Sequence, residues 1–207
     1  MDWPEQLSPA SFAILPLSIR KMRNFMHEYP LENRFAFSPH VAAGAGASIN
    51  LAPVTGGFVI HVLGDAKSEE AALKQALAKI APELGADVRK SAPKQWFWVG
   101  DADVSSDRLA EIQAGLPSEF ALADQTHGRL RMVLSGASSR IVLAKGTMVD
   151  LSPEMFAIGR SAMTQIGHIG AMITRTADDS FELIVLRSFA STLWDELQHM
   201  AAEFCHP

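Results

Sequence analysis

The stretch LRMVLSGASSRIVLAK, residues 130–145, decides the fold. Its first half alternates: Leu130, Met132 and Leu134 are apolar, and Arg131, Val133 and Ser135 lie between them. This period of two predicts a strand with one buried face, formed by the three apolar residues.

The second half of the stretch, residues 137–145, is predicted as a helix that follows a tight Ser-Gly turn. The residues predicted to pack inward are Ile141, Val142 and Ala144, and those predicted to face outward are Ser138, Ser139, Arg140 and Lys145. Gly146 is predicted to end the helix, because glycine adopts the left-handed conformation without Cβ strain. Strand, turn and helix together predict a compact unit.

Further strands and helices alternate irregularly on both sides of this unit. Strands are predicted at residues 58–63, 95–99, 120–123, 161–174 and 181–186, with a bend or bulge at Gly167 and Gly170 in the fourth. Helices are predicted to begin at Ser68, at Ser105 or Ser106, and near Ser188. Gly85 is predicted to end the first of them. The inner face of the last is predicted to carry Leu193, Trp194 and Leu197. A turn at residues 177–180 predicts a hairpin. This pattern favours an α+β fold with mixed or antiparallel sheets and packed helices over a doubly wound parallel sheet.

The first 56 residues differ from the rest. They contain six of the eleven prolines and no sustained periodicity. Such a segment buries too little apolar surface to order itself. We therefore predict two parts: an extended, proline-rich N-terminal arm at residues 1–56, which lies along the main domain or reaches another protein, and an α+β domain at residues 57–207.

Composition restricts the function classes. The net charge of -5 and pI near 5.8 give no nucleic-acid footprint. The single cysteine, Cys205, cannot form an internal disulfide, which favours a reducing compartment. No signal-peptide pattern or long apolar run is present, so we expect no membrane contact and a cytoplasmic location.

No catalytic or metal constellation is predicted from spacing. The seven histidines lack metal-ligand spacing, and His168 is interpreted either as a group lining a cleft or as a hydrogen-bonded strand residue. Asp178 and Asp179 could bind a cation, but a turn explains them equally well. Ser135 lacks the first glycine of a nucleophile elbow. The glycines at 44–46 lack the flanking strand and helix of a dinucleotide site and are interpreted as a linker.

Several segments resemble one family. The segments that carry the likeness are LRMVLSGASSRIVLAKGTMVDL (130–151), IGRSAMTQIGHIG (158–170), SFELIVLRSFASTLWDEL (180–197) and, more weakly, QWFWVGD (95–101). In order and spacing they resemble the gamma subunit of heterotetrameric sarcosine oxidase. Where the family typically has a cysteine this chain has Ser161, so a role for that thiol is not carried over.

The resemblance implies a folate-binding domain like that of the glycine-cleavage T-protein. It also implies a complex with alpha, beta and delta subunits that oxidatively demethylates sarcosine. FAD, FMN, NAD, zinc and tetrahydrofolate would be bound on those other subunits, and the gamma chain would be structural. No cofactor is expected on this chain alone, which agrees with the lack of a catalytic constellation in the sequence.

Three other interpretations remain open from the sequence. A similar chain would serve a dehydrogenase of another N-methyl amino acid, such as N-methylglutamate. A free-standing folate-binding module or aminomethyltransferase would need a preformed pocket and a carboxylate facing the pterin. A T-protein-like scaffold in an unrelated assembly is the third possibility.

Overall fold

The computed structural model describes residues 48–204 and no others. The elements before the midpoint are β1 (Asn50–Pro53), β2 (Phe58–Gly64), α2 (Glu70–Ile80), the short 3-10 helix η2 (Pro82–Leu84), β3 (Asp87–Ala92), β4 (Gln95–Gly100) and α3 (Ser106–Gly115). They are followed by β5 (Phe120–Asp124), β6 (Arg129–Ser135), α4 (Ser139–Gly146), β7 (Ser161–Ile166), β8 (Ile169–Ala177), β9 (Ser180–Leu186), η3 (Arg187–Phe189), α5 (Ala190–Ala201) and η4 (Ala202–Phe204). Every strand pair among them is antiparallel. The predicted α+β fold class is confirmed.

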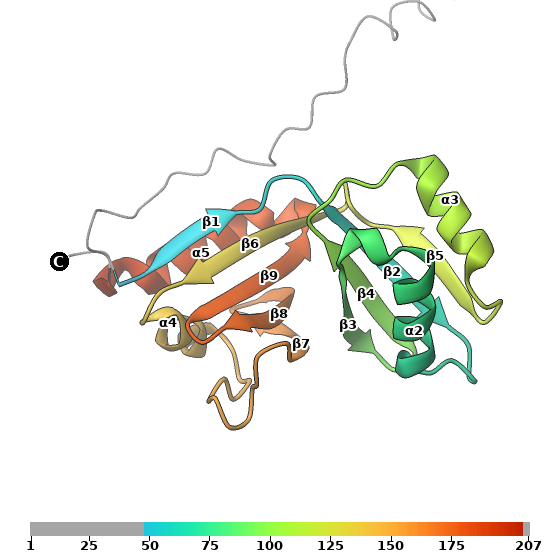
Figure 1. Ribbon diagram of the computed structural model, residues 1–207. Coiled ribbons are helices and arrows are strands. Elements are labelled where there is room, and N and C mark those ends of the chain that lie inside the picture. Colours follow the sequence, from blue (N-terminus) through green and yellow to red (C-terminus); the bar gives the residue numbers. More distant parts are fainter. Residues whose placement is uncertain (1–47, 205–207) are drawn as a thin grey trace, which may run out of the picture. The chain divides into compact units, whose positions relative to one another are not determined.

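One sheet has five strands in the order β1-β6-β9-β8-β7. Its strand β6 contains the alternating segment that decides the fold, and Leu130, Met132 and Leu134 are buried as predicted. Helices α4 and α5 contact each other and pack on this sheet, as Figure 1 shows. The inner face of α5 carries the predicted Leu193, Trp194 and Leu197, all buried.

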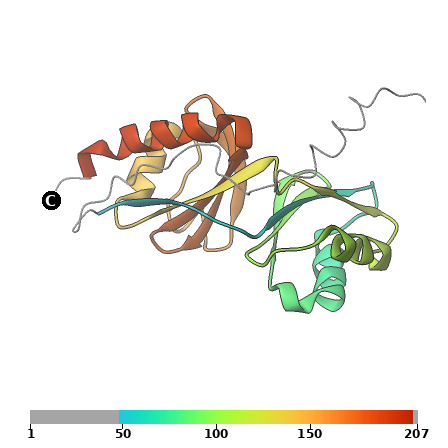
Figure 2. The same ribbon diagram turned by 90° about the horizontal axis from the view of Figure 1, so that it is seen from above.

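The other sheet has four strands in the order β3-β4-β2-β5. One of its faces packs against α2 and α3, which Figure 2 also shows on a single side of that sheet. The core of this layer consists of Phe58, Ile60, Val62, Leu73, Leu77, Trp96, Trp98, Ile112 and Phe120. Part of the opposite face joins a smaller apolar cluster with the five-stranded sheet, made of Val59, Phe97, Val99, Met172 and Ile184. Each sheet thus has one helix-covered face, and the two sheets share apolar contacts through the other.

The stretch predicted as one strand at residues 161–174 is a hairpin. β7 ends at Ile166 and β8 begins at Ile169, with Gly167 in the left-handed region at φ +58°. The sequence prediction of a bend was too mild, because a left-handed glycine lets the chain reverse completely. The reversal pairs Ser161 with Thr174.

The predicted orientation of α4 was wrong in part: Val142 is buried and Lys145 is exposed as predicted, but other positions differ. Ile141 and Ala144 face solvent, whereas Ser139 is fully buried and its hydroxyl donates to the backbone oxygen of Asp179. Helix α4 buries Val142 and Leu143, and Ser139 lies on the same side because it is three and four residues before them. Gly146 does end α4, but without a left-handed conformation.

The close packing around Gly146 explains its presence. A Cβ there would lie 2.9 Å from Ile166 Cγ2 and 3.0 Å from Met200 Sδ.

The first predicted helix begins after Glu69, and Ser68 instead receives a hydrogen bond from the backbone nitrogen of Asp65. Ser105 does cap α3, accepting from the Arg108 backbone at 3.2 Å.

Two further segments, β3 and the predicted N-terminal arm, differ from the sequence prediction. β3 was not expected from the sequence, because DVRKSA lacks apolar alternation and forms by pairing with β4. The predicted arm at residues 1–56 lies mostly outside the described part, and its last residues include β1, which pairs with β6. Phe189, the residue directly before α5, is 50% exposed. Among residues 48–204 no helix is long and apolar enough to cross a membrane.

Candidate functional site

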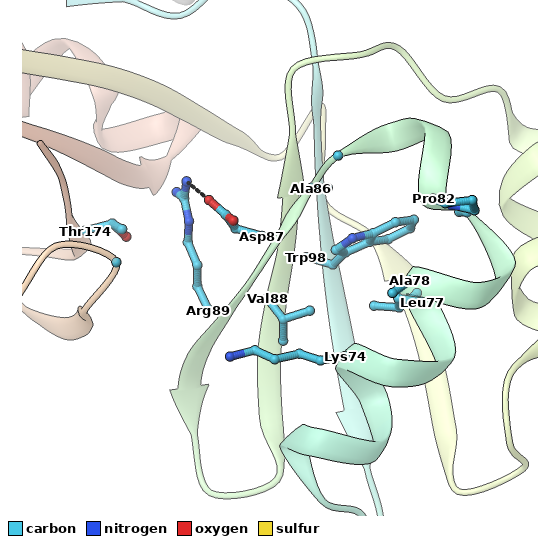
Figure 3. Close-up of a pocket in the computed structure, with 13 residues that line it drawn as sticks. Lys74, Leu77, Ala78, Pro82, Ala86, Asp87, Val88, Arg89, Trp98 and Thr174 are labelled. Carbon is cyan, nitrogen blue, oxygen red and sulfur yellow. Dashed lines mark ion pairs between the residues drawn. The ribbon is translucent and has the colours of Figure 1, made fainter.

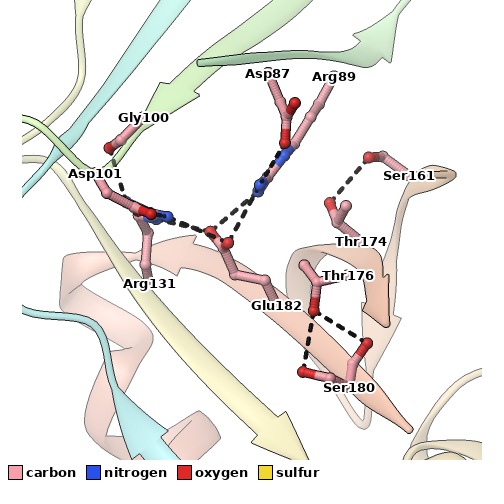
Figure 4. Close-up of polar contacts among 10 residues, drawn as sticks. All are labelled: Asp87, Arg89, Gly100, Asp101, Arg131, Ser161, Thr174, Thr176, Ser180 and Glu182. Carbon is pink, nitrogen blue, oxygen red and sulfur yellow. Dashed lines mark hydrogen bonds and ion pairs between the residues drawn. The ribbon is translucent and has the colours of Figure 1, made fainter. Parts of the chain in front are cut away.

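A buried cluster of charged side chains joins the two sheets. Glu182 of β9 receives two hydrogen bonds from Arg89 of β3, at 3.0 and 3.2 Å, and two from Arg131 of β6, at 2.7 and 3.2 Å. Arg131 also donates to the backbone oxygen of Gly100 at 2.9 Å and to Asp101 at 2.7 Å (Figure 4). The three central residues are only 4–8% exposed. Glu182 therefore links strands of different sheets. We call Arg89, Arg131 and Glu182 together the clasp.

The surroundings of Glu182 and Arg131 favour the charged form of each. Burial alone would raise the pKa of Glu182, but the hydrogen bonds and charges of Arg131 and Arg89 outweigh it and lower that pKa. Burial opposes the charge of Arg131 as well, yet Glu182 and Asp101 raise its pKa overall. A carboxylate held by four guanidinium hydrogen bonds is poorly placed to accept a substrate proton. The clasp is suited to holding the sheets together rather than to acid–base chemistry.

Gly57 makes room for the clasp. It lies at φ +76°, and a Cβ there would come within 2.3 Å of the Gly100 oxygen and 2.8 Å of Arg131 Nη1. Its backbone nitrogen donates to Asp103 at 3.1 Å. Only glycine combines this left-handed conformation with so close an approach to the buried guanidinium.

A second polar group lies at the border of the helix-free face of the four-stranded sheet. The guanidinium of Arg129 stacks over the Phe97 ring at 4.4 Å, and the His61 ring lies 5.0 Å from the same ring. Burial lowers the pKa of His61, and the charge of Arg129 lowers it further, against a hydrogen bond with Gln95. Burial also lowers the pKa of Arg129. Burial thus opposes the charged form of both groups, and Arg129 still carries its positive charge next to His61.

A pocket of about 530 Å³ surrounds the edge strand β3. Leu77, Val88 and Trp98 line it on the helix side, while Arg89 extends from the other side of the strand towards Thr174, as Figure 3 shows. Its one carboxylate, Asp87, lies 3.6 Å from Arg89 and is largely exposed. The pocket therefore offers an apolar wall and a charged rim.

The histidines considered in the sequence do not come together. His127, His168 and His199 are exposed on separate elements, and His61 is the half-buried one described above. His27, His40 and His206 lie outside the described residues, as do Gly44, Gly46 and Cys205. Within the described chain, no three His, Cys, Asp or Glu side chains are grouped so that they could hold a metal ion.

The other sequence candidates have structural partners. Asp178 accepts a hydrogen bond from Arg175 at 3.1 Å, so this carboxylate is engaged by a buried arginine. Ser135 pairs with Asn50 and Ser180 in the sheet. Ser161, at the position of the family cysteine, shares a 2.9 Å hydrogen bond with Thr174.

The described residues do not fit a dinucleotide or flavin site of the common kind. Such sites place a pyrophosphate at the start of a helix that follows a strand in a parallel sheet. Both sheets here are antiparallel throughout, and the metal-ligand grouping that zinc needs is missing from residues 48–204.

The members of the clasp were not predicted from the sequence. Arg131 was predicted to face outward, and Glu182 and Arg89 were not singled out. A signal existed: a lone glutamate inside FELIVL and a lone arginine inside LRMVL are charges of opposite sign in otherwise apolar strands. Buried charges require partners, so two such residues are candidates for one pair.

Comparisons with known proteins agree with this fold. A solved heterotetrameric sarcosine oxidase from Corynebacterium sp. U-96, in complex with pyrrole 2-carboxylate, contains a chain that matches with a TM-score of 0.67 at 20% identity. The match covers 80% of this chain and 90% of that chain. The glycine cleavage system aminomethyltransferase T from Bartonella henselae matches with a TM-score of 0.55 at 19% identity, over 73% of this chain and 46% of that one. The predicted T-protein-like fold is thus confirmed.

The sequence comparisons are more specific than the structural ones. No curated protein matches the chain closely. Residues 69–203, more than half of the chain, match the family described as "Sarcosine oxidase, gamma subunit family". The match runs from α2 to α5 and includes Arg89, Arg131 and Glu182, whereas β1 and β2 precede it. The chain therefore belongs to the sarcosine oxidase gamma subunit family.

Proposed function

We propose that this chain is a non-catalytic, structural subunit of a heterotetrameric sarcosine oxidase. The observation that carries the proposal is the family match over residues 69–203. The likeness to nearly the whole length of one chain in such an enzyme supports it. In this role the chain contributes rigid shape and contact surface to the oxidative demethylation of sarcosine to glycine.

The reactive groups are proposed to lie on the alpha, beta and delta subunits. FAD, FMN, NAD, zinc and tetrahydrofolate would be bound there, since cofactor chemistry needs groups held around a reactive atom. In the described part of this chain, the buried carboxylate is fully engaged by arginines, and the histidines are scattered. Neither arrangement resembles a base next to a substrate proton.

The test is to compare the complex with and without this chain. We expect the purified full-length chain to show no sarcosine turnover, and co-expression with the other subunits to recover it in one stable particle. Leaving the chain out should lower the yield or thermal stability of that particle. Sarcosine turnover by the chain alone, or its failure to enter any complex, would overturn the proposal. Assays with N-methylglutamate on the same particle decide between the two N-methyl amino acid substrates.

One observation favours a second candidate, a small-molecule-binding module. The pocket at the edge of β3 is large enough for a drug-sized ligand and is half apolar in character, with Trp98 in its wall. Calorimetry of the isolated chain with tetrahydrofolate tests this candidate. A Kd below roughly 10 μM, about −7 kcal/mol, would favour a folate-binding module or aminomethyltransferase over a purely structural subunit.

A further inference from the structure

One face of the four-stranded sheet carries no helix among the residues that the structure describes. His61 of β2 lies between Phe97 of β4 and Ala123 of β5 in the strand register. Leu63 of β2 lies in the same way between Gln95 of β4 and Ala121 of β5. We call these six residues the open face. Leu63 is 39% exposed and Ala121 is exposed, whereas Phe97 at the border is covered by Arg129. The accessible part of the face is therefore formed by Leu63 and Ala121, with His61, Gln95 and Ala123 half-buried beside them.

Arg129 is the charged group at the border of this face. No carboxylate in the described part of the chain pairs with it, and its Nε is buried without a hydrogen-bond partner. The other strand arginines, Arg89, Arg131 and Arg175, each contact a carboxylate. The open face itself contains no acidic residue. A half-buried cation without an anion is electrostatically unsatisfied.

From these observations we infer that the open face is a docking surface for a polypeptide partner that presents an aspartate or glutamate carboxylate to Arg129. This inference rests on the proposed function, because it names the surface through which the subunit meets another chain of the complex. The guanidinium stacks on Phe97 and is therefore held in place before the partner arrives. A preorganised, partly desolvated arginine beside apolar side chains is typical of the residues that dominate interface energetics.

The alternative of strand addition at the edge of this sheet is blocked at β5. The side-chain amide of Gln113 donates to the Phe120 oxygen at 3.0 Å and accepts from the Leu122 nitrogen at 2.6 Å. It occupies the backbone groups that an added strand would need. A partner is therefore expected on the face of the sheet, over Leu63 and the two alanines.

The alternative of a small anionic metabolite has less support. Arg129 lines neither the pocket around the edge of β3 nor the shallower one beside α4. Small-molecule sites are usually concave and enclose most of the ligand. An accessible sheet face with one anchored cation is better suited to a protein surface.

The experiment measures assembly of the full-length chain with the remaining subunits of the complex, purified without it. Arg129→Met keeps the apolar stem over Phe97 and removes the charge. We expect this variant to bind at least about tenfold more weakly, and Arg129→Lys to recover part of the loss. The matched control is Arg108→Met on α3, a partly exposed arginine that pairs with Glu83 and Glu111. It should bind like the wild type, and Arg129→Met should lose less affinity at high salt than the proteins that keep the charge at residue 129.

The outcomes separate the inference from the proposed function. If the wild type assembles and Arg129→Met assembles equally well, the docking surface is wrong and the structural role stands. If the wild type itself does not assemble, the proposed function fails first. Titration of the isolated chain with glutarate, followed by the His61 resonances, covers the small-anion case. Saturable binding tighter than about 1 mM that disappears in Arg129→Met would assign the site to a free carboxylate and overturn the polypeptide partner.

Discussion

Arg129 and Arg131 lie two residues apart on β6, so they leave the strand on the same face, yet their surroundings are opposite. Arg131 is 8% exposed and donates to Glu182, Asp101 and a backbone oxygen. Arg129 stacks on Phe97 and pairs with no carboxylate of the described chain. The pKa of Arg131 is raised, and the pKa of Arg129 is lowered.

The difference indicates that an arginine side chain has a different role at each of these two positions. A buried cation whose hydrogen bonds are nearly all made within the chain contributes to the fold. Removal of its anion leaves an uncompensated buried charge. A half-buried cation without an internal anion contributes little to folding and is available to another molecule. Stability and assembly measurements should therefore separate the two arginines cleanly.

The largest expected effect is on the paired side of this comparison. Glu182→Gln leaves two guanidiniums buried without a counter-charge, and we expect it to lower the free energy of unfolding by about 3–5 kcal/mol. Urea denaturation measures the change. The matched control is Glu83→Gln, which removes an exposed carboxylate that also pairs with an arginine and should leave the midpoint nearly unchanged. Equal midpoints for both variants would mean that the clasp does not hold the sheets.

Gly57 provides a geometric test of the same clasp. Gly57→Ala introduces a Cβ 2.3 Å from a backbone oxygen and 2.8 Å from Arg131 Nη1, in addition to left-handed strain. We expect a loss of more than about 2 kcal/mol. Gly159→Ala is the control, because Gly159 is also left-handed at φ +84° but has no atom within 4 Å of its Cβ position. It should cost about 1 kcal/mol, which is the strain alone; a similar loss for both variants would remove the clash from the explanation.

The pH dependence of stability is the next smaller effect. The pKa of Glu182 is lowered in the folded protein, so below the ordinary glutamate pKa of about 4.3 the unfolded chain binds more protons than the folded chain. The contribution of the clasp is complete above that pH and is lost as the pH falls through the folded pKa. Glu182→Gln should therefore show an acid slope that is shallower by up to about 1.4 kcal/mol per pH unit. Parallel acid slopes for the two proteins would contradict the lowered pKa.

The sequence predicted the elements whose pattern is local. Strands β2, β4 and β9 are short, mostly apolar runs that end at glycines or turn residues, and their predicted bounds agree with the structure to within one residue. The inner face of α5 was predicted from apolar residues at helical spacing. β3 was missed because it has no such pattern and depends on its pairing with β4. The hairpin between β7 and β8 was missed because the apolar character continues through the turn.

The clasp could not be predicted because its members are far apart in the chain. Arg131 meets Glu182 only because β6 pairs with β9 in a particular register, and Arg89 reaches the same carboxylate from the other sheet. Local periodicity carries no information on such pairing. The same limit applies to Arg129, whose lack of a partner can be seen only when every neighbouring strand is in place.

The smallest expected effect lies on the unpaired side of the comparison. Arg129→Met removes a partly desolvated charge and keeps the stacking stem, so the isolated chain should melt within about 2 °C of the wild type or slightly higher. The charge of Arg129 is one cause of the lowered pKa of His61, after burial. That pKa should rise in the variant yet stay below its ordinary value, because burial remains; NMR titration of the His61 ring measures it. A large loss of stability in Arg129→Met would place this arginine with Arg131 as part of the fold, and an unchanged pKa of His61 would mean that the two groups do not interact.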